Sequence, residues 1–474
     1  MKLTFWGAAR QVTGSKHLAE LEDGTRILID CGLDYEKKNE FDERNARFPF
    51  DPASIDLLIL THAHIDHSGN VPNLIRQGFT GPILCTRPTM ELSDFLLQDS
   101  LNIQRMELQS RQRAMKKKGG KKHRHGRQAA EAQPLYLKKH IMDMMDQCRV
   151  LEFGNSYKYN DALTVEFAEA GHILGAASVV LTVTEENRKI RVGFTGDLGN
   201  YSTKLVNDPA EMHGLDYLVS ESTYGGRNHN SHGSDACNVL LRHVEDTCVS
   251  KGGKLVIPAF SVGRTQAILF AFHQLYREGK LPAVRIFTDS PLAIRSTSVY
   301  QHNMECMNDE AAAFQKKWGS LFDFPLLQVV EDMHESELLS TLDEPCVIIS
   351  AAGMVEGGRI QMHVRNNIGI ANNSVLIAGF CADGTLGHRL LQGQDFVEIN
   401  FKKRPVRADI FRTDAFSAHP DHDQLLGYIR GTHKKGALKG VFLVHGDPAQ
   451  MEKLAADLSN MEVHMPAAGQ SFTL

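Results

Sequence analysis

The chain has 474 residues, a formal net charge of −5 and the apolar, aromatic and charged content of an ordinary globular protein with two or three domains. Its 8 cysteines are scattered without a CxxC pair, which disfavours a disulfide framework or a zinc ribbon and is typical of a reducing cytoplasm. No stretch approaches the roughly 18 apolar residues of a membrane span, so we expect no membrane contact, and a polyanion would need local basic patches to bind.

The first part of the chain predicts mainly short strands closed by turns, at 3–6, 26–30, 57–61, 163–170, 178–184 and 189–195. Two predicted helices, 90–115 and 135–148, interrupt this pattern. The segment between them, 116–127, is densely basic, and like charges repel one another. We interpret it as a solvated loop, with contact to a nucleic-acid backbone as the alternative.

From about residue 226 the pattern changes to alternating strands and helices. The predicted strands are 255–260, 284–288, 346–350 and 375–379, with helices beginning at Arg264 and Leu292. Such alternation indicates a parallel sheet covered by helices. After it we expect a strand at 406–412, a helix at 421–430, a strand at 441–445 and a last helix.

The strongest local signal is the run His62-Ala63-His64-Ile65-Asp66-His67, directly after an apolar strand. Three imidazoles and a carboxylate this close cannot be buried without partners, because their desolvation costs too much free energy. A strand end can direct such side chains at metal ions, and imidazole with carboxylate suits zinc. The run therefore predicts a metal site.

Further polar residues end other predicted strands, namely His172, Asp197 and His445. Each of them alone is more often structural, but the repeated arrangement, with small neighbours that let backbone and metal approach, favours ligands. Asp30 also ends a strand. It either caps the turn before Gly32 or orients a ligand histidine, and the two interpretations are equally good on local grounds.

These residues, in this order, resemble the metallo-β-lactamase superfamily, whose signature is HxHxDH followed by distant His, Asp and His. More narrowly, the chain resembles the β-CASP group of nucleic-acid-processing enzymes, and within it the bacterial and archaeal relatives of the pre-mRNA 3′-end endonuclease. The motifs that carry this narrower resemblance are at 220–225, 258–266, 350–354, 384–387, 416–419 and 443–446. The matches extend from Asp30 to His445.

The resemblance implies an α/β (α+β) fold: an αββα metallo-β-lactamase sandwich, formed by residues 1–225 and 406–474, with an inserted parallel β-CASP α/β domain at 226–405. It implies two Zn²⁺ ions per chain, with Mn or Fe not excluded. One ion would be bound by His62, His64 and His172, the other by Asp66, His67 and His445, and Asp197 would bridge them. Glu221 and His419 correspond to the group's characteristic carboxylate and histidine.

The implied function is a zinc-dependent ribonuclease. A hydroxide shared by the two ions would attack phosphorus and leave 5′-phosphate and 3′-hydroxyl ends. Asp66, Glu221 and His419 are the expected catalytic residues, with His419 as the general acid held by Glu221. His445 favours RNA, because RNA-cleaving members have histidine there. The chain ends soon after His445, which favours an endonuclease and leaves 5′-exonuclease activity open.

Substrate phosphate has further candidate contacts at Ser261, Arg264, Arg359, Gly384 and Thr385, next to strand-to-helix junctions and turns. Capping and turn formation explain them equally well. Two other functions stay open: hydrolysis of a small ester, thioester or lactone, and a non-catalytic RNA-binding scaffold. RNA is the expected partner, and the oligomeric state is open, a homodimer included.

Overall fold

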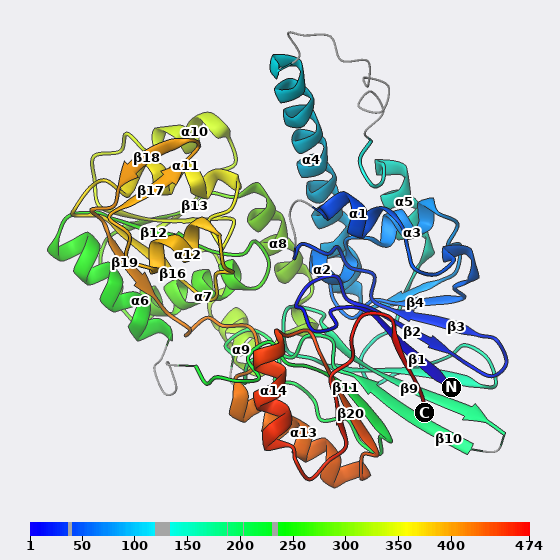
Figure 1. Ribbon diagram of the computed structural model, residues 1–474. Coiled ribbons are helices and arrows are strands. Elements are labelled where there is room, and N and C mark those ends of the chain that lie inside the picture. Colours follow the sequence, from blue (N-terminus) through cyan, green and yellow to red (C-terminus); the bar gives the residue numbers. More distant parts are fainter. Residues whose placement is uncertain (37–39, 119–132, 187, 202, 230–235) are drawn as a thin grey trace.

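The computed structural model describes all residues except 37–39, 119–132, 187, 202 and 230–235 (Figure 1). The predicted basic loop at 116–127 thus lies outside the described residues, apart from the backbone of its first residues, which ends helix α4 (Arg87–Lys118). Among the described residues, no helix is both long and apolar enough to cross a membrane.

Two sheets packed face to face form the sandwich. The first has the order β22-β1-β2-β3-β4-β5-β6 and the second the order β21-β20-β11-β10-β9-β8-β7. Alternate residues of their strands, such as Leu3, Val165 and Phe194, are buried between them, as the period of two of a strand requires. The strands of the first sheet are β1 (Lys2–Gly7), β2 (Lys16–Glu20), β3 (Arg26–Ile29), β4 (Leu57–Ile59), β5 (Ile83–Cys85), β6 (Cys148–Val150) and β22 (Gln470–Thr473). Those of the second are β7 (Ser156–Lys158), β8 (Leu163–Glu169), β9 (Ala177–Glu185), β10 (Arg188–Phe194), β11 (Tyr217–Glu221), β20 (Gly440–Val444) and β21 (Val463–His464).

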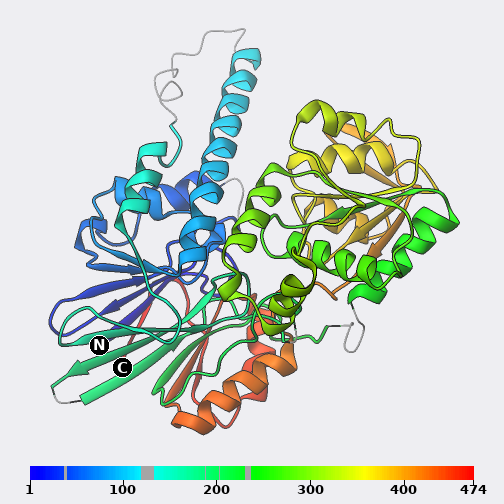
Figure 2. The same cartoon turned by 180° about the vertical axis from the view of Figure 1, so that it is seen from behind.

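Helices cover both outer faces of the sandwich (Figures 1 and 2). The first sheet is covered by α1 (Phe41–Ala46), α2 (Ile65–Ser68), α3 (Val71–Arg76), α4 and α5 (Lys138–Gln147), and the second by α13 (His422–Gly436) and α14 (Pro448–Asp457). The chain then returns to the first sheet, where β22 pairs with β1 and brings the two termini together. This last strand is not predicted from the sequence, but the αββα sandwich is confirmed.

A second domain interrupts the sandwich with a parallel sheet of order β14-β13-β15-β12-β16-β19, as the alternating pattern predicts. Its strands are β12 (Lys254–Pro258), β13 (Arg285–Thr288), β14 (Leu327–Val329), β15 (Cys346–Ser350), β16 (Ser374–Ile377) and β19 (Asp409–Arg412). Its helices are α6 (Ala236–Val244), α7 (Arg264–Arg277), α8 (Pro291–His302), α9 (Asp309–Trp318), α10 (Met333–Leu338), α11 (Gly358–Asn367) and α12 (Leu386–Leu391). A hairpin of β17 (Phe396–Ile399) and β18 (Lys402–Pro405) follows α12, and the sheet continues past residue 405 through β19.

The two domains share one apolar core. Leu92 and Phe95 of α4 and Ile173 of the sandwich are buried in the same cluster as the side chains of α7 and Tyr300 of α8. Leu174 also donates its backbone N–H to the Tyr300 hydroxyl at 3.2 Å. The segment after β8, which contains Ile173 and Leu174, therefore contacts the sandwich and the inserted domain.

Candidate metal centre

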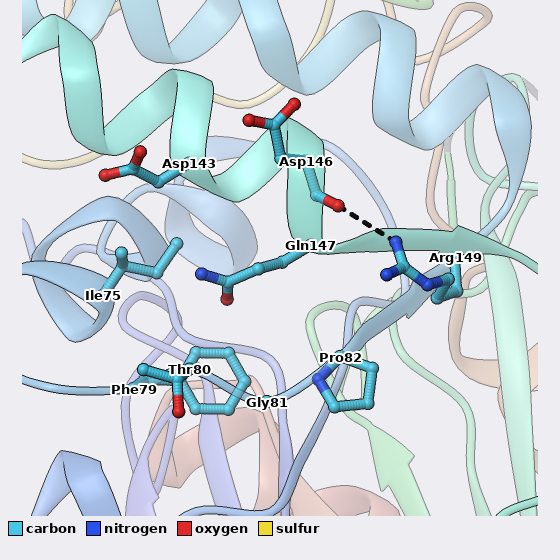
Figure 3. Close-up of a pocket in the computed structure, with 9 residues that line it drawn as sticks. All are labelled: Ile75, Phe79, Thr80, Gly81, Pro82, Asp143, Asp146, Gln147 and Arg149. Atoms are coloured by element: carbon cyan, nitrogen blue, oxygen red, sulfur yellow. Dashed lines mark hydrogen bonds between the residues drawn. The ribbon is translucent and has the colours of Figure 1, made fainter.

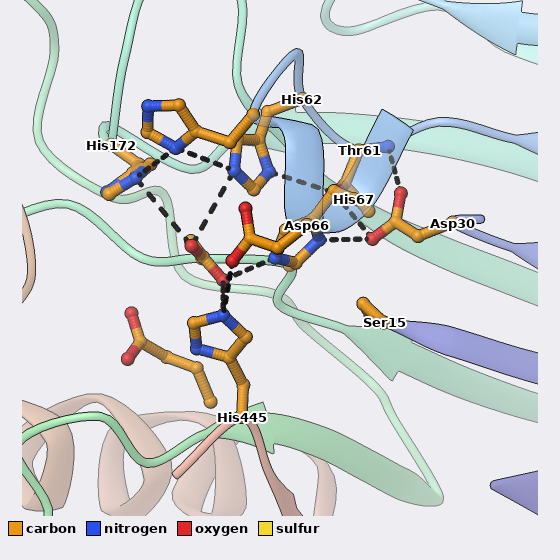
Figure 4. A network of polar contacts seen from close by, with 12 residues as sticks. Ser15, Asp30, Thr61, His62, Asp66, His67, His172 and His445 are labelled. Atoms are coloured by element: carbon orange, nitrogen blue, oxygen red, sulfur yellow. Dashed lines mark hydrogen bonds and ion pairs between the residues drawn. The ribbon is translucent and has the colours of Figure 1, made fainter. Parts of the chain in front are cut away.

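The strand ends that carry the predicted ligands meet at one edge of the sandwich. In the second sheet β8, β10, β11 and β20 all run in the same direction, because β9 is antiparallel to β8 and β10 while β10, β11 and β20 pair in parallel. Their carboxyl ends therefore lie side by side. In the first sheet, β4 leads directly into His62 and the short helix α2, which faces this edge (Figure 4).

One group of donor atoms comprises nitrogens of His62, His64 and His172 and an oxygen of Asp197. His62 Nε2 lies 3.1 Å from His64 Nδ1, and His172 Nε2 lies 3.2 Å from the same atom. Asp197 Oδ2 lies 3.6 Å from His62 Nε2 and 3.7 Å from His172 Nε2. Four donor atoms thus surround one point.

A second group comprises Asp66, His67 and His445. Here the other oxygen of Asp197 takes part: Oδ1 lies 3.2 Å from His67 Nε2 and 3.5 Å from His445 Nε2. His445 Nε2 is also 3.4 Å from Asp66 Oδ2. The two oxygens of Asp197 therefore face different groups, and the carboxylate stands between them.

These distances fit metal coordination. Donor atoms about 2.0–2.1 Å from a tetrahedral ion are separated from one another by about 3.3 Å. His67 Nε2 and Asp197 Oδ1 are buried, and neither makes a hydrogen bond within the described residues despite their short separation. Buried polar atoms are rarely left this way unless another ligand occupies them. The residue set thus fits two cations that share one carboxylate.

The opposite nitrogens of the histidines are held by hydrogen bonds (Figure 4). His67 Nδ1 binds Asp30 Oδ2 at 2.7 Å, and His62 Nδ1 lies 3.1 Å from Thr61 Oγ1, which itself donates to Asp30. On the other side His445 Nδ1 binds Thr223 Oγ1 at 3.0 Å. Such contacts fix the ring orientation and turn the remaining nitrogen to the ion. In the sequence, Thr61 is marked only by its place directly before His62, and Thr223 only by its place in the 220–225 motif.

A close backbone approach brings Asp30 to His67. A Cβ added at Gly32 would lie 1.5 Å from the Asp66 carbonyl oxygen, so only glycine allows the 30–32 turn to pack against α2. Asp30 itself adopts a left-handed φ of 58° and is buried. It does not act as a simple turn cap, since its carboxylate accepts from Thr61 and contacts His67.

The histidines of the first group are held neutral. Burial, and next the charge on His67, lowers the pKa of His62 well below its ordinary value, and burial lowers the pKa of His64 to about 4. The pKa of His67 is instead raised, because Asp197 and Asp30 outweigh the opposing effect of its burial. Coordination requires neutral imidazole, so a cation bound beside Asp197 would require His67 in its neutral form.

Glu221 and His419 form a pair beside the first group. His419 Nδ1 lies 2.9 Å from Glu221 Oε1, and the His419 ring centroid is 4.5 Å from that of His172. The Glu221 side chain is fully buried, whereas that of His419 is 20% exposed. Glu221 also accepts the backbone N–H groups of Leu198 and Thr223, so its carboxylate is rigidly held and orients the imidazole.

The candidate phosphate contacts differ in their surroundings. Arg264 is near the metal centre, where its Nε donates to the Phe416 carbonyl at 3.2 Å, close to His419 in the chain. Ser261 precedes α7 and accepts the Gln266 side chain through its carbonyl. Thr385 caps α12 by accepting the N–H of His388, and Gly384 adopts φ +81° in the turn before it. The structural interpretation thus fits these last two residues.

Arg359 is bound within the inserted domain. Its Nη1 donates to Asp289 Oδ1 at 2.6 Å, and it also donates to the carbonyls of Val330 and Glu331. Asp289 follows β13, and its other oxygen contacts Ser336 and His363. This buried cluster of Asp289, Ser336, Arg359 and His363 was not predicted, because its members are far apart in sequence and match no motif.

The cavity in Figure 3 lies apart from the metal centre. It has a volume of about 630 Å³ and is lined by Ile75, Phe79, Thr80, Gly81, Pro82, Asp143, Asp146, Gln147 and Arg149. None of the predicted site residues lines it, so the proposed chemistry depends on the strand ends alone.

Family comparisons agree with this geometry. Residues 17–127 match the metallo-beta-lactamase superfamily, 265–390 the Beta-Casp domain, and 403–466 a Zn-dependent metallo-hydrolase RNA specificity domain. The chain is 33% identical over 457 residues to Ribonuclease TTHA0252 of Thermus thermophilus, covering 96% of this chain and 95% of that one. It is 29% identical to transcription termination factor FttA of Methanocaldococcus jannaschii, covering 95% of this chain and 67% of that protein. An RNase J-like protein of the same organism is 28% identical, with 94% and 93% covered. The resemblance in the motifs is thus confirmed, and the chain belongs to the β-CASP ribonuclease family of the metallo-β-lactamase superfamily.

Proposed function

We propose that the chain is a two-metal endoribonuclease, and the observation that carries this proposal is the division of the Asp197 oxygens between two groups of donor atoms. His62, His64 and His172 would hold one ion and Asp66, His67 and His445 the other, with zinc as the expected metal. Bound cations would supply positive charge that neutralises a phosphodiester and lower the pKa of a water molecule at the site.

The chain's own residues supply the proton for the leaving group. His419 lies beside the metal groups with part of its ring exposed, and Glu221 holds Nδ1. Nε2 is then the nitrogen that faces substrate, and it donates a proton to the departing 3′-oxygen. Because water is the nucleophile, the 2′-hydroxyl takes no part, and the products carry 5′-phosphate and 3′-hydroxyl ends.

Arg264 supports binding rather than chemistry. Its guanidinium lies 5.0 Å from the Phe260 ring and donates to the Phe416 carbonyl, so it is held at the start of α7 against the segment that follows β19. A fixed cation at this place would orient a substrate phosphate. Arg359, Gly384 and Thr385 have structural roles and receive no substrate role. Ser261, which precedes α7, stays a candidate for phosphate contact.

RNA is the proposed substrate because residues 403–466 match a family described as an RNA specificity domain and because the relative of Thermus thermophilus is a ribonuclease. Internal cleavage is proposed from the narrower resemblance of the chain to the bacterial and archaeal relatives of the pre-mRNA 3′-end endonuclease. This is the finer part of the proposal.

A circular RNA separates the two modes of cleavage, since it has no end from which an exonuclease can begin. The purified protein, its metal content measured by mass spectrometry, is incubated with circular RNA, end-labelled linear RNA, single-stranded DNA and a small ester, with and without chelator. We expect chelator-sensitive opening of the circle. Degradation of linear RNA alone would replace the endonuclease by an exonuclease, and turnover of the ester alone would reject the nuclease.

A further inference from the structure

The hairpin β17–β18 has a tip that the fold itself does not require. Ile399 pairs with Lys402, so Asn400 and Phe401 form a two-residue turn, with φ of 51° and 60°. Turns with two left-handed residues favour Asn-Gly, and a bulky residue at the second position is strained. Here the second position is phenylalanine.

The same phenylalanine is almost fully in solvent. Phe401 is 97% exposed, more than any other large apolar side chain among the described residues, and Phe396 at the start of β17 is 49% exposed. The base of the hairpin is anchored, since Val397 and Ile399 are each 2% exposed and pack with Leu386 and Leu390 of α12. A rigid support therefore presents an aromatic ring to solvent at a conformational cost that glycine would remove.

The sequence around this ring is cationic. Lys402, Lys403 and Arg404 follow Phe401 directly, against one acidic residue of the hairpin, Glu398, which pairs with Lys403 across the strands. Lys403 Nζ lies 4.4 Å from the centre of the Phe396 ring. In a chain with a net charge of −5, this cationic and aromatic element is the local basic patch that a polyanion needs.

We propose that the hairpin tip binds single-stranded RNA, with a base stacked on Phe401 and phosphates held by Lys402 and Lys403. Exposed aromatic rings beside cations are the combination by which proteins hold single strands without reading their sequence. The proposal rests on the proposed function for the identity of the polyanion. In both overall views the hairpin lies on the inserted domain, away from the strand ends of the metal centre (Figures 1 and 2). An RNA that contacts both places must extend from the metal centre to the hairpin.

The test compares Phe401→Gly with the unchanged protein on RNAs of increasing length. Base stacking on one aromatic residue contributes about 1–3 kcal/mol, so KM for a long unstructured RNA should rise about tenfold, with kcat unchanged and with a smaller effect on a short RNA. Because glycine suits the turn, the Tm of the variant should not fall. Phe401→Trp should restore binding, and Leu338→Ala, at an exposed apolar residue of α10 (50% exposed), is the matched control.

The cationic contribution is tested separately. The double variant Lys402→Gln, Lys403→Gln should weaken binding of the long RNA and flatten its salt dependence. Binding is measured by fluorescence anisotropy of labelled RNA with the metals chelated, so that loss of binding is seen even if the protein cleaves no RNA. A failed nuclease assay with intact hairpin-dependent binding would reject the proposed function and keep this inference.

Two results would overturn the inference. One is an unchanged KM and anisotropy for long RNA in Phe401→Gly. The other is a change of oligomeric state in this variant, seen by light scattering, with RNA binding unaltered; the tip would then contact a second copy of the chain.

Discussion

Polar residues follow buried strands in both domains, but the two domains use them differently. In the sandwich, His67 Nε2 and Asp197 Oδ1 are buried without hydrogen bonds in the described residues. In the inserted domain, Asp289 follows β13 in the same way, yet its carboxylate contacts Ser336, Arg359 and His363. A polar residue at a strand end is therefore a ligand candidate where its donor atoms converge with those of other such residues, rather than on a guanidinium of the chain.

The difference also separates stability from chemistry. Unpartnered donors directed at one point destabilise the metal-free fold, because buried imidazoles and carboxylates lose their hydration. Both oxygens of Asp289, by contrast, have partners within the chain and belong to one network. A substitution at Asp197 should then change metal content and activity, whereas one at Asp289 should change the free energy of unfolding.

The largest effect is expected at Asp197. Asp197→Asn removes the one carboxylate that faces both donor groups, and two-metal sites supply several kcal/mol of charge stabilisation. We expect RNA cleavage to fall by about a thousandfold or more and bound metal, measured by mass spectrometry, to decrease. Asp161→Asn, at a fully exposed side chain, is the control. Full metal content with normal turnover would remove Asp197 from the metal centre.

A substitution at Asp289 should lower stability and leave metal content unchanged. Asp289→Ala leaves the guanidinium of Arg359 and the buried His363 without their carboxylate, and breaking a buried ion pair costs about 3–5 kcal/mol. The free energy of unfolding in urea should fall by about this amount, while metal content is kept. Asp409→Asn, in an ion pair whose side chains are 37% and 45% exposed, should change stability little. Loss of metal in Asp289→Ala would contradict the distinction between the domains.

His419 sharpens the comparison inside the metal centre. His419→Ala removes the proposed general acid but no donor atom of either group, so turnover should fall about a hundredfold with metal content unchanged. The control is His302→Ala, whose ring hydrogen-bonds Ser298 of its own helix. If the variant lost metal as well, His419 would have to act in the metal site rather than beside it.

Much of this arrangement was predictable from sequence because the signals are local. The HxHxDH run, the strand ends at His172, Asp197 and His445, and the change to alternating strands and helices all depend on short segments. The confirmed parallel sheet follows from this alternation, and the confirmed αββα sandwich from the family resemblance that the motifs carry. The motifs also predicted Glu221 and His419, and these two side chains do lie together.

What sequence could not predict depends on distant partners. Arg359 was a phosphate candidate by its glycine neighbours, but its partner Asp289 directly follows β13, 70 positions away. The strand β22 is short and half-polar, and only its pairing with β1 defines it. The strain and exposure of Phe401 depend on the register of β17 with β18, which no local pattern contains.

Glu169 tests the comparison most finely, because it ends β8 in the sandwich and yet has a partner. Asn207 Nδ2 donates to its Oε1 at 3.1 Å, and burial raises the pKa of Glu169 to about 7. Between the ordinary pKa of 4.5 and this raised value, the folded protein keeps a proton on Glu169 that the unfolded chain has released. The contribution of Glu169 to stability is therefore fully present below about pH 4.5 and is lost as the pH rises through about 7. Glu169→Gln cannot ionise and keeps the Asn207 contact. Its free energy of unfolding should exceed that of the unchanged protein by roughly 3 kcal/mol above pH 7, with the difference vanishing near pH 4.5. Thermal unfolding across this range measures it, and a constant difference at every pH would show that burial does not govern the ionisation of Glu169.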